Sequence, residues 1–99
     1  MFTKIAGVWG AKSIEGFAVI RRGSPMSQFE MEYSADSRSL RYPLENLVPG
    51  SMQLIFSEQI GPWLPPHAHE PIDSAEQKRI ATRIVQIMHF LGDHKFEVA

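Results

Sequence analysis

Residues 73–92 read DSAEQKRIATRIVQIMHFLG, and this stretch decides the fold because a helix is encoded together with both of its ends. Asp73 and Ser74 are both favourable N-caps, and each is followed three residues later by Glu or Gln, the spacing of a capping box. Gly92 follows the last apolar residue, where a helix commonly ends in a left-handed residue.

The side chains of this segment divide into two faces at helical spacing. The apolar stripe consists of Ile80, Ile84, Ile87, Met88 and Leu91, widened by Ala81 and Val85. The polar face consists of Lys78, Arg79, Thr82, Arg83, Gln86 and His89. We therefore expect a helix that packs by one side against a sheet.

Short strands precede and follow this helix. The expected strands are Phe2–Trp9, Glu15–Arg22, Ser27–Ser34, a return strand with Leu40, Tyr42 and Leu44, a strand with Met52, Leu54 and Phe56 that runs on to Ile60, and Lys95–Val98. The expected turns are Gly10–Ser13, Gly23–Pro25, Ala35–Arg38 and Pro49–Gly50. The sequence predicts an α+β fold: an antiparallel sheet of about five or six strands, one C-terminal helix packed on one face, and a short closing strand.

Alternation within the strands predicts which side chains face the core. Phe29, Met31 and Tyr33 share one side of their strand, and glutamates occupy the other. Arg41 on the return strand is expected to pair across the hairpin with Glu30 or Glu32. Residues 15–22 are apolar on both sides, with Phe17 and Val19 opposite Ala18 and Ile20, which favours a central position in the sheet.

Composition restricts the class of protein. The chain has 99 residues, which predicts a single domain over residues 1–99, and 43% hydrophobic residues are enough for a packed core. The net charge of −1 gives no basic surface for nucleic acid, and no apolar run reaches the roughly 20 residues needed to span a membrane. Cysteine is absent and the N-terminus lacks a secretory pattern, so we expect a cytoplasmic protein.

One motif points to metal chemistry. Gly61 is followed after five residues by His67-Ala68-His69, as at the start of a cupin metal motif. The carboxylate expected beyond the second histidine is missing, and prolines on both sides favour an extended loop over a barrel strand. We therefore favour a solvent-facing loop and keep a small metal-dependent enzyme that uses His67 and His69 as an alternative.

Other polar groups have simpler interpretations. Glu30 and Glu32 resemble an acid/base pair but are more typical of a solvated strand face. Three cations on the helix face, Lys78, Arg79 and Arg83, are expected to be solvated rather than to bind phosphate. Trp63 is interpreted first as a cover for the core and second as an interface anchor. The methionines expected to fill gaps in the core are Met26, Met31, Met52 and Met88.

The layout from Gly16 to Val98 resembles that of bacterial immunity proteins of the "immunity protein 74" type. The matching features are a hairpin from Met31-Glu32-Tyr33-Ser34 to Leu40–Glu45, a strand ending near Ser57–Ile60, Trp63 with Pro65-Pro66, the helix start at Asp73 and Ser74 with Glu76, and the final segment Gly92–Val98. The segments Met1–Trp9 and Arg21–Ser27 depart from the pattern.

The resemblance implies a protein that is not an enzyme, needs no cofactor, and binds a cognate toxin domain stoichiometrically. Its partner would be an ADP-ribosyltransferase or nuclease domain delivered by an Rhs-type or type VI secretion system. The expected contact residues are Glu30, Glu32, Asp36, Arg38, Glu58 and Trp63. An accessory subunit of a larger complex, which would use its sheet as an interface, remains a further alternative.

Overall fold

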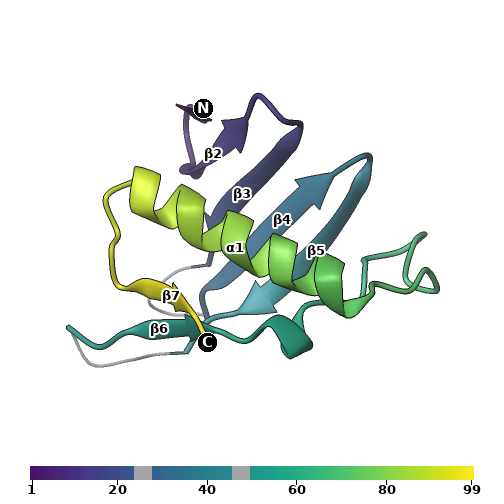
Figure 1. The fold of residues 1–99 in the computed structure, drawn as a ribbon. Helices are drawn as coiled ribbons and strands as arrows, with labels where there is room; N and C mark the ends of the chain where they lie inside the picture. Colours follow the sequence, from purple (N-terminus) through teal and green to yellow (C-terminus); the bar gives the residue numbers. More distant parts are fainter. Residues whose placement is uncertain (24–27, 46–49) are drawn as a thin grey trace.

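The computed structural model describes residues 1–23, 28–45 and 50–99. Within these ranges the chain forms a five-stranded sheet, one long helix and a separate pair of short strands (Figure 1). The expected turns at Gly23–Pro25 and Pro49–Gly50 lie partly outside the described residues. Met26, which was expected to fill a gap in the core, also lies outside them.

The main sheet is an antiparallel meander in which neighbours in sequence are neighbours in space. Its strands are β1 (Phe2–Lys4), β2 (Trp9–Ser13), β3 (Phe17–Arg22), β4 (Glu30–Ala35) and β5 (Arg38–Pro43), in the order β1-β2-β3-β4-β5. The predicted fold class and the central place of the strand at residues 17–22 are confirmed. Ala18 and Ile20 are only half-buried, because their side of the sheet is not the one covered by the helix.

Helix α1 (Ser74–Phe90) begins and ends where the sequence predicts. Of the two possible caps, Asp73 is the N-cap, and its carboxylate accepts a hydrogen bond from the backbone N–H of Glu76 at 2.8 Å. Gly92 has a φ of +94° and donates to the carbonyl of His89, while the next N–H donates to the carbonyl of Met88. These two bonds form a Schellman motif, which satisfies carbonyls at the end of the helix.

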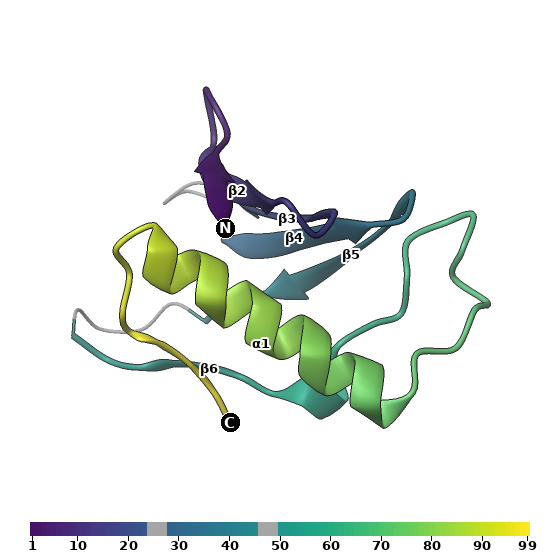
Figure 2. The ribbon, with the colours of Figure 1, turned by 45° about the horizontal axis from the view of Figure 1, so that its top comes forward.

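The helix lies across the inner face of the sheet, as Figure 2 shows from a second direction. All seven side chains of its predicted apolar stripe are buried. They meet a second set of buried side chains from the sheet: Ala11, Phe17, Val19, Met31, Tyr33, Leu40 and Tyr42. The alternation predicted for β4 is therefore confirmed at Met31 and Tyr33. The described helix is not long and apolar enough to cross a membrane.

The prediction for the first strand and its turn is wrong. The chain turns earlier, at Gly7, which has a φ of +81°, and Ile5 N–H donates across this turn to the carbonyl of Gly10. Residues 9–13, which include the segment predicted as a turn, instead form β2. Gly10 fits there because it lacks a Cβ, which would lie 2.5 Å from the carbonyl oxygen of Val19.

The prediction for residues 52–60 is also wrong. Only β6 (Gln53–Ile55) is a strand, and a 3-10 helix, η1 (Ser57–Gln59), follows it. Ile55 is the buried side chain of β6, whereas Met52 and Leu54 are 45% and 37% exposed, so Met52 does not fill the core. β6 pairs in parallel with the predicted closing strand, β7 (Phe96–Val98), rather than joining the main sheet.

Candidate binding site

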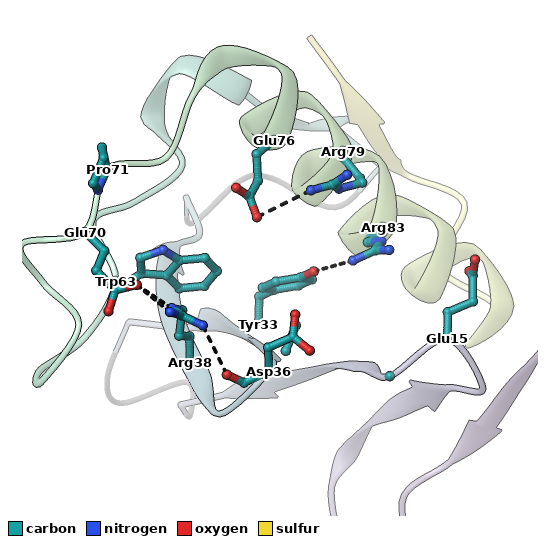
Figure 3. Close-up of a pocket in the computed structure, with 12 residues that line it drawn as sticks. Glu15, Tyr33, Asp36, Arg38, Trp63, Glu70, Pro71, Glu76, Arg79 and Arg83 are labelled. Carbon is teal, nitrogen blue, oxygen red and sulfur yellow. Dashed lines mark hydrogen bonds and ion pairs between the residues drawn. The ribbon is translucent and has the colours of Figure 1, made fainter.

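A cavity of about 480 Å³ lies between the tip of the β4–β5 hairpin, the loop that precedes α1 and the first half of α1 (Figure 3). Its lining is strongly charged but mixed in sign. Three arginines and four carboxylates face it: Arg38, Arg79 and Arg83 with Glu15, Asp36, Glu70 and Glu76. The lining residues come from segments far apart in the sequence, so the cavity exists only in the folded chain.

Two aromatic side chains form the inner wall of this cavity. Tyr33 and Trp63 are almost fully buried, and their rings stack at a centroid distance of 6.4 Å. The backbone N–H of Leu64 donates to the carbonyl of Ser39 at 2.8 Å, which fixes the tryptophan loop to the edge strand β5. Trp63 is 6% exposed, so it covers the core, as the first interpretation of this residue expects, and it also lines the cavity.

Glu70 ties the loop to the tip of the hairpin. Its Oε1 accepts from both Nε and Nη2 of Arg38 at 2.6 Å, and its Oε2 lies 2.6 Å from Nδ1 of His67. The hydrogen bond from the His67 ring, followed by that from Arg38, lowers the pKa of Glu70. Both carboxylate oxygens are therefore engaged, and Arg38 is held in one orientation at the cavity wall.

Arg83 occupies a different environment from the one predicted for it. Its Nη1 donates to the hydroxyl of Tyr33 at 2.8 Å, and its guanidinium lies 4.2 Å from the ring centroid of Phe17. Among the described residues it makes no ion pair with a carboxylate. The prediction of a solvated face is wrong here. Arg83 adjoins Ile80 and Ile84 at the margin of the apolar stripe. This position in the sequence could have indicated that the Arg83 side chain is half-buried.

A ladder of charges covers the open face of the sheet. Arg41 lies 3.5 Å from Glu30 and 3.6 Å from Glu32, which confirms the predicted cross-hairpin pairing. Arg22 on β3 adds a second partner for Glu32 at 3.2 Å. Each exposed pair of this kind stabilises the fold by only about 0.2–1 kcal/mol, so the ladder chiefly orients these charges.

The six predicted contact residues do not form one patch. Asp36, Arg38 and Trp63 line the cavity. Glu30 and Glu32 project from the open face of the sheet, since they alternate with the buried Met31 and Tyr33. Glu58 is exposed on η1. Two further residues of the cavity lining, Arg79 and Arg83, belong to the helix face that the sequence predicts to be solvated.

Within the described part of the chain, the histidine motif does not assemble a metal centre. His67 and His69 lie in an irregular loop, as predicted, and His67 faces Glu70. In the ranges 1–23, 28–45 and 50–99, no three or more His, Cys, Asp or Glu side chains are arranged to hold a metal ion. The alternative of a metal-dependent enzyme therefore gains no support from the geometry.

No protein-family model, curated protein or solved structure matches this chain. The cavity offers oriented charged groups beside two aromatic side chains, an arrangement that can bind a complementary polar group.

Proposed function

We propose that this protein is an immunity protein, a stoichiometric inhibitor that binds a toxin domain and blocks its active site or the access of its substrate. One observation carries the proposal: the charged tip of the β4–β5 hairpin stands between two hollows. Asp36 and Arg38 line both the cavity of about 480 Å³ and a second hollow of about 530 Å³. A protruding tip beside concave surfaces can interlock with a partner's surface.

The tip is preorganised for binding. Asp36 and Ser37 have φ values of +51° and +64°, as in the tight turns that match the twist of a hairpin. Arg38 is already held by Glu70, so its side chain loses little freedom when a partner binds. A rigid charged tip of this kind supports tight and specific association.

The mixed charges also suit rapid capture of a toxin. Complementary potentials accelerate encounter and discriminate against wrong partners. Glu30 and Glu32 on the open face are paired with Arg22 and Arg41, so this face offers a toxin oriented charges of both signs. The sequence resemblance supplies the class of partner, for which we propose an ADP-ribosyltransferase or nuclease domain.

The first test is co-purification of the tagged protein with the product of the neighbouring upstream gene, followed by titration calorimetry. We expect a one-to-one complex and rescue of growth when both genes are expressed. Asp36→Asn should weaken binding at least tenfold, about 1.4 kcal/mol, because it removes a charge but tolerates the same left-handed backbone. Glu97→Gln on β7 is the matched control. Absence of a complex, or equal affinity of the two variants, would contradict the proposal.

One observation favours the alternative of an accessory subunit. Trp9 is 44% exposed and borders a hollow formed with Leu91, Gly92, Asp93, His94 and Lys95. An exposed tryptophan beside a hollow is typical of an interface anchor. Under this alternative, Trp9→Ala abolishes co-migration with a larger complex and Asp36→Asn does not, which separates the two functions in one experiment.

A further inference from the structure

We propose that the corner of the cavity formed by Arg83, Tyr33 and Arg79 is a binding site for a single carboxylate group. Arg83 is the centre of this site. Only one of its N–H donors is used within the described part of the chain, in the 2.8 Å bond to Tyr33. The ring of Phe17 holds the guanidinium plane from one side, which leaves the remaining donors as a rigid fork for a bidentate acceptor.

The hydroxyl of Tyr33 supplies the second donor. Its oxygen accepts from Arg83, so its own proton is available to donate elsewhere. No acceptor for that proton occurs among the described residues, and Tyr33 lines the cavity. An oxygen atom bound to Arg83 from within the cavity would therefore meet a second hydrogen-bond donor beside the first.

Arg79 supplies the third donor group. It lies one helical turn before Arg83, so both side chains project from the same face, as Figure 3 shows. Its pair with Glu76 is 3.4 Å long and exposed, with Arg79 at 58%, and such a pair contributes little free energy. Arg79 can therefore turn from Glu76 towards a bound anion without a large cost.

The surrounding charges select a monoanion. Four carboxylates line the cavity against three arginines, so the net charge of the lining repels a dianion such as phosphate more strongly than a monoanion, and the local arginine donors must offset the smaller repulsion of a monoanion. A carboxylate has the single charge and planar geometry that the Arg83 fork accepts. Trp63 and Tyr33 also line the cavity but are almost fully buried, so the group is recognised chiefly by its charge rather than by the carbon chain that bears it. The ligand class is thus an organic monocarboxylate, either free or carried by a partner's side chain.

The site can be tested on the isolated protein, whether or not the proposed toxin complex exists. Sodium acetate is titrated into the ¹⁵N-labelled protein at constant ionic strength, while the arginine Nε–H signals are followed by NMR. We expect a saturable shift of the Arg83 signal with a millimolar Kd, and weaker binding of phosphate. Sodium butyrate, tested in the same way, shows whether the carbon chain adds affinity.

Substitutions show which side chains bind the carboxylate. Tyr33→Phe should weaken acetate binding severalfold. Arg79→Gln should also weaken it, and this variant changes an exposed side chain, so it remains informative even if Arg83→Gln does not fold. Arg41→Gln, on the open face of the sheet, has the same charge change and should bind acetate like the unchanged protein. A linear shift identical to that with chloride, tighter binding of phosphate, or equal loss in Arg79→Gln and Arg41→Gln would overturn the proposal.

Discussion

The hydroxyl of Tyr42 in β5 accepts a hydrogen bond from the backbone N–H of Phe56 at 3.0 Å. The same oxygen lies 3.3 Å from Oε1 of Gln59, to which it donates. Tyr42 is 3% exposed, so these bonds form in a place that water scarcely reaches. They connect the edge of the main sheet to the segment that holds β6 and η1.

We expect Tyr42→Phe to lower the free energy of unfolding by about 1–3 kcal/mol, because it leaves the Phe56 N–H without a partner at little change in packing. Urea denaturation measures the loss. Faster hydrogen exchange at the amide of Phe56 would locate it. An unchanged midpoint together with unchanged exchange at Phe56 would show that this bond does not form in solution.

Asp73→Ala should destabilise the protein by about 1 kcal/mol, because it removes the acceptor for the Glu76 N–H at the start of the helix. Ser74→Ala is the matched control, since Ser74 is the first helical residue and makes no cap in the structure. We expect it to be almost neutral. Thermal unfolding of both variants, followed by circular dichroism, decides between two caps that look equivalent in the sequence.

Ile55→Ala should cost about 2–5 kcal/mol, because it empties a fully buried position between the helix and the closing strands. Leu54→Ala, at the neighbouring exposed position, should cost much less. Chemical denaturation of the pair tests which side chain of β6 faces inward. The reverse order of stabilities would restore the alternation predicted from Met52, Leu54 and Phe56.

The attachment of the loop to the hairpin should weaken in acid. The pKa of Glu70 is lowered in the folded protein by His67 and Arg38, so its ion pairs stabilise the fold above the ordinary glutamate pKa. That contribution is lost as the pH falls through the lowered pKa. We expect the protection factors of the amides in residues 64–72, which are corrected for the intrinsic pH dependence of hydrogen exchange, to fall in this acidic range. Glu70→Gln should lower these protection factors at neutral pH and abolish their further loss in acid.

The sequence predicted the helix and the β4–β5 hairpin because local signals and the tertiary fold agree there. Asp73, Gly92 and the apolar stripe each specify the helix independently. In β4 the alternation of apolar and polar residues is sufficient to predict a strand, because one face of the strand is buried and the other faces solvent. The prediction of these elements did not depend on contacts between residues that are distant in the sequence.

The predictions that were wrong have a common physical cause. The short strands β1 and β6 have three residues each, too few for alternation to fix their bounds. The position of Gly10 depends on the backbone of β3, and the environment of Arg83 depends on Tyr33, which lies far away in the sequence. The cavity was missed for the same reason, because its walls come together only when the helix packs on the sheet.

The pairing of β6 with β7 also bears on how the chain folds. The five-stranded meander is made of contacts between successive strands, which close short loops, whereas β6 and β7 meet only after the whole helix has been placed between them. We therefore expect the contacts between β6 and β7 to form after the folding transition state. Substitutions in β6 and β7 should then accelerate unfolding with little effect on the folding rate. The resistance of this domain to unfolding would reside in its smallest sheet.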